Sequence, residues 1–361
     1  MFIILISHTP GNYLIMWIPA RFGFSDAAEI FVFCSGMASA IAFGKTFDRK
    51  GWFIGTARVA YRCWQVYWAH ICLFFFIAMM VAAFDASGWF EKEYVGSLNL
   101  KHFFADPRGN LVGLFTLTYV PNFFDILPMY LVILAMLPLV MALSHVSLPL
   151  TGVVLVSIWM VANQGYLQFP AEPWSLRVWF FNPMAWQLLF FTGFAFMRGW
   201  LPAPPVNRWL IGLAGAVVLI SLPIAYYRIR REFPGLEELY SAIEPFRSKT
   251  NEGILRYVHF LSLAYLGWVA AGVGGRNLIA SGAGLLSRIW GWLVAVIIKV
   301  GQQSLAIFVF SMAASRVLGM MLDVVGRNNL TMTIVNLIGF AALILVAYLV
   351  AWFKAVPWRK A

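Results

Sequence analysis

The fold is decided by the stretch Ser7-His8-Thr9-Pro10-Gly11-Asn12 and its continuation Phe22-Gly23-Phe24-Ser25-Asp26-Ala27-Ala28-Glu29-Ile30-Phe31-Val32-Phe33-Cys34-Ser35-Gly36. It places a histidine at the end of one apolar segment and two carboxylates at the head of the next. Ionisable groups are costly at membrane depth, so those that occur there indicate a functional site by default.

The rest of the chain is as apolar as this stretch. Of its 361 residues, 61% are hydrophobic and 11% are charged, whereas a soluble domain carries about 25% charged residues. Apolar runs of about 20 residues recur along the length, which indicates membrane-spanning helices and not the short alternating strands of a barrel. We therefore expect an all-α, polytopic membrane protein with a single integral-membrane domain over residues 1–361.

The apolar runs predict about ten transmembrane helices. They are Met1–Trp17, Asp26–Phe43, Ala57–Phe84, Ile126–Leu143, Leu148–Val161, Met184–Met197, Trp209–Tyr226, Ile254–Val273, Leu293–Leu318 and Thr331–Phe353. The run from Met1 to Ile6 is too short to cross about 30 Å of hydrocarbon, so we expect that the first helix is truncated.

The charge pattern predicts the orientation. Lys and Arg number 26 against 15 Asp and Glu, a net charge of +11, which we assign to anionic lipid heads of the bilayer and not to nucleic acid. The basic residues gather in short loops, which places both termini in the cytoplasm; they are Lys45, Arg49, Lys50, Arg58, Arg62, Arg198, Arg208, Arg276, Arg288, Lys354, Arg359 and Lys360. The long loops 85–125, 163–182 and 228–252 then lie outside, and 99–120 is expected to be an interfacial helix and not a span.

The cysteines predict neither a disulfide framework nor a metal site. Cys34, Cys63 and Cys72 are odd in number and lie in or beside apolar runs, without CxxC or Cys/His ligand spacing.

His8 is the leading candidate for catalysis. A neutral imidazole can take a proton from a sugar hydroxyl near physiological pH; the alternative is a histidine held structurally at the interface. Asp26 and Glu29 lie three residues apart, share a helical face and would orient His8 or hold its charge. Asp-x-x-Glu at the head of an apolar run is equally a capping box, and both interpretations stay open.

Arg58 and Arg62 are candidates for binding a phosphate-bearing donor. They lie four residues apart at the predicted cytoplasmic mouth of the third span, which suits an acyl-CoA. Ordinary positive-inside residues are the alternative.

The remaining candidates lie near the predicted outer ends of spans. Tyr130, Asn182 and Gln187 are polar groups that would line a cavity and contact substrate. Arg256 and His259 form an i, i+3 pair that is expensive in a span without anionic company. A substrate carboxylate would supply that company, and so would Glu252 in a purely structural pairing.

Several of these segments together resemble the OpgC family of the acyltransferase-3 superfamily, whose members are ten-span inner-membrane proteins. The resemblance runs in order over nearly the whole chain; it is carried by residues 7–12 and 24–33, Leu127-Pro128-Met129-Tyr130, residues 181–193, and Gly301-Gln302-Gln303-Ser304-Leu305. The resemblance implies a multi-pass protein of the bacterial inner membrane that transfers an acyl group, typically succinyl from cytoplasmic succinyl-CoA, to hydroxyls of periplasmic glucans.

The family's essential histidine maps onto His8, and its cytoplasmic basic residues onto Arg58 and Arg62. Two departures are that no arginine precedes His8 by about ten residues, as expected of a truncated helix, and that Ser7 stands where an aspartate is usual. No cofactor is expected to stay bound; acyl-CoA is a donor substrate.

Two other functions remain open at the level of sequence. One is a transporter or exporter of a sugar-linked or small anionic substrate, although no matched pair of Gly/Pro-broken segments in two related halves is present. The other is a non-catalytic scaffold for glucan synthesis. In the acyltransferase hypothesis, Arg256 would suit the free carboxylate of a succinyl group.

Overall fold

The computed structural model describes residues 1–359, which form helices without a β-strand, so the all-α prediction is confirmed for that part of the chain. Lys360, one of the basic residues after the last predicted span, lies outside the described residues. The chain forms two compact units. The first contains residues 1–18, 87–90 and 264–361, and the second contains residues 19–86 and 91–263. The expectation of a single domain stays a prediction.

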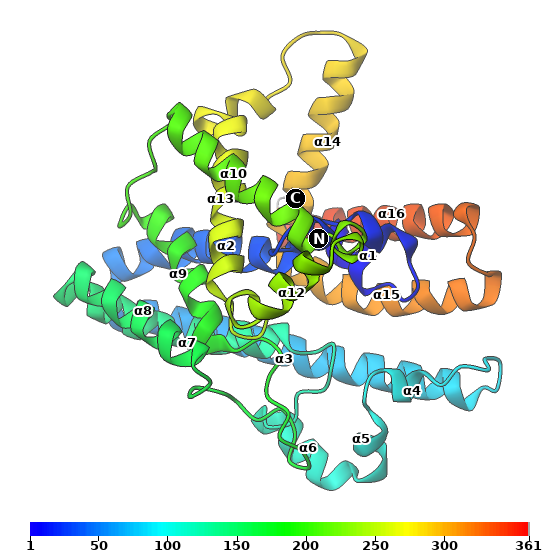
Figure 1. The fold of residues 1–361 in the computed structure, drawn as a ribbon. Helices are drawn as coiled ribbons and strands as arrows, with labels where there is room; N and C mark the ends of the chain where they lie inside the picture. Colours follow the sequence, from blue (N-terminus) through cyan, green and yellow to red (C-terminus); the bar gives the residue numbers. More distant parts are fainter. Residues whose placement is uncertain (360–361) are drawn as a thin grey trace. The chain divides into compact units, whose positions relative to one another are not determined.

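The second unit begins with a long helical stretch that turns at a glycine (Figure 1). It comprises α2 (Ala27–Ser39), a π-helical turn (Ala40–Gly44) and α3 (Lys45–Ala86), 60 residues in all. A straight helix of that length would measure about 90 Å, three times the hydrocarbon thickness of about 30 Å. Gly51 interrupts it with φ 80° and ψ 173°, a region that is essentially restricted to glycine. Two separate helices result, as predicted for the second and third spans.

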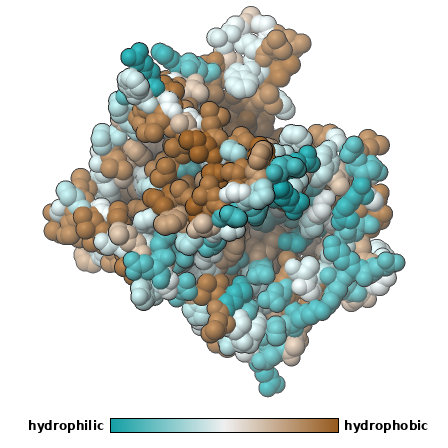
Figure 2. Space-filling model, viewed as in Figure 1, coloured by the Kyte–Doolittle hydropathy of each residue, from teal (hydrophilic) through white to brown (hydrophobic). Residues whose placement is uncertain are grey.

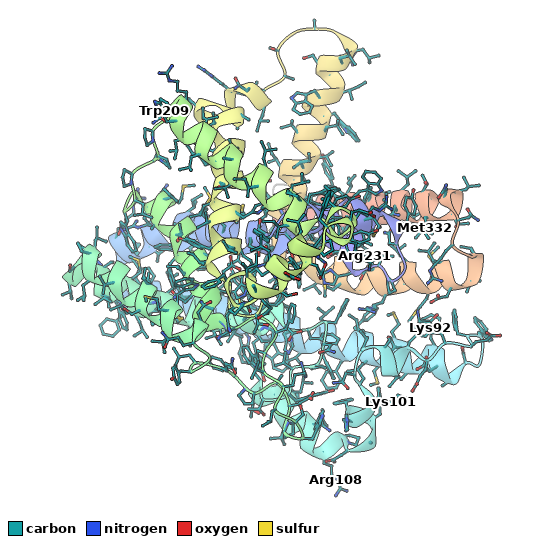
Figure 3. All side chains as sticks on the ribbon, viewed as in Figure 1. Lys92, Lys101, Arg108, Trp209, Arg231 and Met332 are labelled. Carbon is teal, nitrogen blue, oxygen red and sulfur yellow. The ribbon has the colours of Figure 1, made fainter. Side chains whose placement is uncertain are left out.

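Three short helices follow α3: α4 (Tyr94–Ser97), α5 (Lys101–Ala105) and α6 (Pro107–Thr116). At most ten residues long, none can cross a bilayer, as expected for a segment that is not a span; its position outside the membrane stays a prediction. Lys92, Lys101 and Arg108 are exposed on this segment (Figure 3).

The other helices of the second unit are α7 (Ile126–Val146), α8 (Leu148–Asn163), α9 (Pro183–Arg198), α10 (Arg208–Ala225), α11 (Tyr227–Glu232), α12 (Pro234–Ala242) and the first half of α13 (Ile254–Ala271). Its core contains large aromatic side chains of α9, among them the fully buried Trp186, Phe190 and Phe194.

Loops predicted to share a side of the membrane are in contact. Arg198 donates to Asp48 at 2.7 and 2.9 Å at one end, and Asn182 donates to Asn251 at 3.0 Å at the other.

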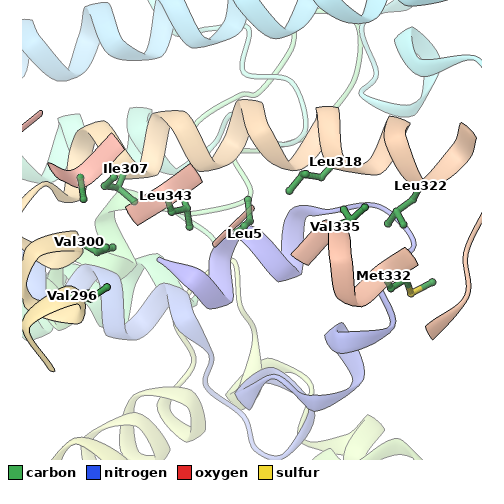
Figure 4. Close-up of a cluster of buried hydrophobic side chains, with 10 residues drawn as sticks. Leu5, Val296, Val300, Ile307, Leu318, Leu322, Met332, Val335 and Leu343 are labelled. Carbon is green, nitrogen blue, oxygen red and sulfur yellow. The ribbon is translucent and has the colours of Figure 1, made fainter. Parts of the chain in front are cut away.

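The first unit joins the start of the chain to its end. Leu5 of α1 (Phe2–His8) is buried in a cluster with residues of α14 (Leu285–Gln302), α15 (Ser304–Val325) and α16 (Asn329–Lys354) (Figure 4). Beyond α1, the side chains of Asn12 and Asn336 exchange hydrogen bonds of 2.8 and 3.2 Å. Both amides are buried, and their polar groups would be unsatisfied if they faced lipid. Their mutual hydrogen bonds therefore fix residues 9–12 against α16.

Seven helical stretches among the described residues are long and apolar enough to cross a membrane, which supports a multi-pass membrane protein. Brown, apolar side chains accordingly cover much of the face in Figure 2; Leu219 and Leu345 are 69% and 60% exposed, as expected for groups solvated by lipid. The count of ten and the position of the termini stay predictions.

Two predicted spans differ from the helices observed. The predicted ninth span, Leu293–Leu318, is wrong, because α14 ends at Gln302 and α15 begins at Ser304. The first predicted span, Met1–Trp17, is helical only from Phe2 to His8, and a 3₁₀ turn covers Tyr13–Trp17. Pro10 explains the second difference, since it cannot continue the α1 hydrogen-bond ladder.

Candidate functional site

The N-terminus of α2 and the start of α13 bring five charged side chains together in the second unit. We call Asp26, Glu29, Lys249, Glu252 and Arg256 the charged cluster. The sequence predicted three of them as site residues; it proposed Glu252 only as a structural partner of Arg256, and Lys249 not at all.

Helix α2 positions the two carboxylates that precede or begin it. Asp26 is its N-cap and accepts a hydrogen bond from the Ala28 N–H at 2.8 Å, while Glu29 Oε2 accepts one from the Asp26 N–H at 2.7 Å. This is the predicted capping box. Each carboxylate keeps a second oxygen for α13 and its preceding loop. The capping box is confirmed, and the role of the two carboxylates in orienting His8 stays a prediction.

Arg256 and Lys249 supply the positive charge. Arg256 donates through Nε to Glu29 Oε1 at 2.7 Å and through Nη2 to the same oxygen, and it also reaches Asp26 Oδ2 at 3.4 Å. Lys249 Nζ donates to Asp26 Oδ2 at 2.5 Å. Both cations are thus compensated by protein carboxylates, which reduces the affinity of Arg256 for the carboxylate of a substrate.

The cluster becomes more buried from Lys249 inward. The side chain of Lys249 is 32% exposed, that of Asp26 15% and that of Arg256 10%, whereas Glu29 and Glu252 are fully buried. Burial alone would raise the pKa of Asp26, but the charges of Lys249 and Arg256 outweigh it and lower the pKa to about 2. For Glu252, burial and the nearby Glu29 raise the carboxyl pKa well above its usual range.

Hydrogen bonds to four consecutive backbone carbonyls hold the segment 249–252 in place. The Trp186 indole donates to the Lys249 carbonyl at 2.9 Å, and the Asn182 N–H donates to the Thr250 carbonyl at 3.0 Å. The Asn163 amide and the Trp159 indole donate to the carbonyls of Asn251 and Glu252, at 2.9 and 3.0 Å. Because α8, α9 and the N-cap of α9 provide the four donors, they fix the positions of Lys249 and Glu252.

His259 lies one turn beyond Arg256 and contacts the residue before Asp26. Its Nδ1 is 2.7 Å from Ser25 Oγ and 3.3 Å from the Ser25 N–H. A backbone N–H can only donate, so Nδ1 is the acceptor and the neutral ring carries its hydrogen on Nε2. The Ser25 hydroxyl therefore donates to His259, and this bond fastens the loop before α2 to α13.

His8 belongs to the first unit, at the end of α1. Its Nδ1 lies 2.8 Å from the Ile4 carbonyl and 3.1 Å from Ser7 Oγ. Since a carbonyl only accepts, Nδ1 carries the hydrogen, and the lone pair of the neutral ring is on Nε2. That tautomer is the one that a general base acting through Nε2 requires.

The predicted donor-binding arginines lie on α3. Arg58 donates to Thr46 Oγ1 at 2.5 Å and Arg62 donates to Gln65 Oε1 at 3.0 Å. Arg62 also interacts with the hydroxyl of Tyr130, so the structure brings these two predicted residues together.

Asn182 and Gln187, which were also predicted to contact substrate, have protein partners. Asn182 caps α9 and donates to Asn251, and Gln187 is fully buried and donates to the Leu155 carbonyl at 2.8 Å. Gln187 Oε1 has no hydrogen-bond partner among the described residues.

Fold and site together define a multi-pass helical membrane protein with a buried charged cluster at one end of its spans. Residues 1–355 match the family described as OpgC protein, and the chain belongs to that family. Neither a curated protein nor a solved structure matches it. Membership of the OpgC family indicates a transferase of the acyltransferase type with a role in glucan modification.

Proposed function

We propose that this protein is an O-acyltransferase of the bacterial inner membrane. It moves a succinyl or similar acyl group from cytoplasmic acyl-CoA to hydroxyl groups of periplasmic glucans. The observation that carries this proposal is the match to the OpgC family over residues 1–355, essentially the whole chain. The tautomer of His8 and the charged cluster are consistent with it.

In the proposed reaction, His8 is the general base. Its Nε2 lone pair takes the proton of a glucan hydroxyl as the hydroxyl oxygen attacks the thioester carbon. The carbon–oxygen bond of the ester forms, the carbon–sulfur bond breaks, and the proton passes to the CoA thiolate. Arg58 and Arg62 bind the phosphates of the donor, for which guanidinium groups are well suited.

We assign the charged cluster to acceptor recognition. Both of its cations are already paired, since Lys249 donates to Asp26 and Arg256 donates to Glu29 and Asp26. Such a cluster favours a neutral ligand rich in hydroxyl groups over an anion, because carboxylates accept hydrogen bonds from hydroxyls. Asp26 and Glu29 then act together with Arg256, and the acyl carboxylate is not required to bind there.

The test is acyl transfer in a strain that lacks its own enzyme and is complemented with the wild type or with His8→Ala. General-base catalysis contributes about 100-fold or more, so we expect anionic glucan from the wild type and at least about a 100-fold lower CoA release with His8→Ala. Anion exchange of the glucan and thiol release in isolated membranes measure this.

His145→Ala is the matched control, because His145 is an exposed histidine in the last turn of α7. It should retain full activity. Identical glucan charge in all strains, the empty one included, would contradict acyl transfer, and transport of a sugar-linked or small anionic substrate would then be the better hypothesis.

A further inference from the structure

Glu252 is the member of the charged cluster whose burial is not explained by hydrogen bonds of its side chain. It is fully buried, and neither carboxyl oxygen has a hydrogen-bond partner among the described residues. Its nearest cation is Arg256, with 3.9 Å between Nε and Oε2. Buried polar groups are normally hydrogen-bonded, so each exception calls for a physical reason.

The backbone of Glu252 is also in an unfavourable conformation. Its φ is +43°, in the left-handed region that side-chain-bearing residues rarely adopt. The Trp159 indole holds its carbonyl, and the three preceding carbonyls are held in the same way. Strained residues held by their surroundings are concentrated at binding and catalytic sites.

Counting charges gives the protonation state of Glu252. Lys249 neutralises Asp26, and Arg256 neutralises Glu29, through hydrogen-bonded ion pairs. An ionised Glu252 would add a third negative charge, for which the described residues supply no hydrogen-bond donor; Arg256, 3.9 Å away, already donates to Glu29. An unpaired buried charge costs far more than a buried neutral acid, so the carboxyl group is uncharged in the resting protein.

Two other buried groups of the second unit lack partners among the described residues: Gln187 Oε1 and His259 Nε2. Gln187 and Glu252 both attach to one turn of α8, through Leu155 and Trp159. His259 lies on α13, and its Nε2 faces Gly23 in the loop before α2. The neutral histidine offers an N–H and the glutamine a carbonyl, and a hydroxyl can satisfy both kinds of group.

We propose that Glu252 is a hydroxyl-binding residue, an uncharged carboxyl group whose two oxygens are completed by hydroxyls of a sugar unit of the acceptor. The inference rests on the proposed function for the identity of the acceptor. A sugar would enter from the side of Lys249 and Asp26, because these two side chains of the cluster are partly exposed whereas Glu252 is fully buried.

Binding of unsubstituted periplasmic glucan, without acyl donor, tests the proposal in purified protein. Glu252→Gln keeps a neutral donor and acceptor and should bind with a Kd within about threefold of the wild type. Glu252→Leu removes both and should raise the Kd at least about tenfold. Glu238→Gln, an exposed residue of α12, is the matched control and should leave the Kd unchanged.

Infrared difference spectra provide a second readout that does not depend on the stability of Glu252→Leu. The wild type should show a carboxylic-acid carbonyl band that shifts on addition of glucan, and Glu252→Gln should lack it. Equal glucan affinity of Glu252→Leu, no binding by the wild type, or a band that glucan leaves unchanged would overturn the proposal. A wild type that binds glucan but transfers no acyl group would contradict the proposed reaction and leave the role of Glu252 intact.

Discussion

Asp125 is a buried carboxyl group outside the charged cluster, just before α7. It accepts a hydrogen bond from the Phe180 N–H at 3.2 Å, but burial dominates and raises its pKa from 3.8 to about 6. The folded protein therefore binds the proton more tightly than the unfolded chain, and stability falls as pH rises from about 4 to about 6. At about 1.4 kcal/mol for each pH unit, the loss is about 3 kcal/mol.

Asp125→Asn should avoid that loss, because the amide oxygen can still accept from Phe180 and carries no charge. We expect the variant to unfold at a higher temperature than the wild type at pH 7.5 in detergent, and at a similar temperature near pH 4. Asp106→Asn changes an exposed cap of α6 in the same way and, as the matched control, should not raise the unfolding temperature at pH 7.5. An unfolding temperature of Asp125→Asn equal to that of the wild type at pH 7.5 would contradict the cost of burying the ionised Asp125 carboxylate.

Single residues also show how far the sequence predicts the site. Asp26, Glu29 and Arg256 were predicted because ionisable groups beside apolar runs stand out without any structure. Lys249 gave no such signal, because it lies in a polar loop and its partner Asp26 is 223 positions away. The importance of Glu252 depends on its φ and on the absence of hydrogen-bond donors, which only coordinates show.

At the scale of elements, two glycines let α2 and α9 pack with their backbones in close approach. A methyl group on Gly193 would overlap the Phe33 carbonyl of α2, and one on Gly36 would overlap the Phe190 carbonyl of α9. Small residues at helix crossings permit this approach in membrane proteins. Since α2 carries Asp26 and Glu29, this packing also sets the position of the charged cluster.

Gly193→Ala should push the two helices apart and destabilise the protein by at least about 2 kcal/mol. We expect a lower unfolding temperature and weaker glucan binding. Gly212→Ala is the matched control, since a methyl group at that position of α10 would have no described atom within 4 Å apart from its chain neighbours and the nearby backbone of α10 itself. Gly212→Ala should be neutral or slightly stabilising, by up to about 1 kcal/mol. Equal stability of the two variants would contradict the close packing of α2 and α9.

Most of the long apolar helices were predictable because a run of apolar residues is visible in the sequence without any structure. Ile126–Val146 and Asn329–Lys354 extend the predicted runs by only a few residues. The break at Gln303 was missed for the same reason, since apolar residues continue on both sides of it. Hydropathy records which residues suit lipid; it does not record where one helix ends and another begins.

At the scale of the whole molecule, the break at Gln303 bears on the sidedness of the chain. If α14 and α15 both crossed the membrane, the loop before α14 would lie outside. Arg276 and Arg288 predict instead that this loop is cytoplasmic. Helix α14 is not uniformly apolar: Arg288 and Lys299 lie eleven residues, or three turns, apart and share a face. Such a helix suits the membrane interface, with α15 alone as the ninth span.

Reporter fusions at three positions test this topology. We expect a fusion at Gly282, in the loop before α14, to be fluorescent with green fluorescent protein and inactive with alkaline phosphatase, whose disulfides form only outside the cytoplasm. A fusion at Asn328, between α15 and α16, should show the reverse, and one after Lys354 should again be cytoplasmic. Alkaline phosphatase activity at Gly282 would mean that α14 crosses the membrane, and the loop that holds Arg276 would then violate the charge pattern on which the orientation rests.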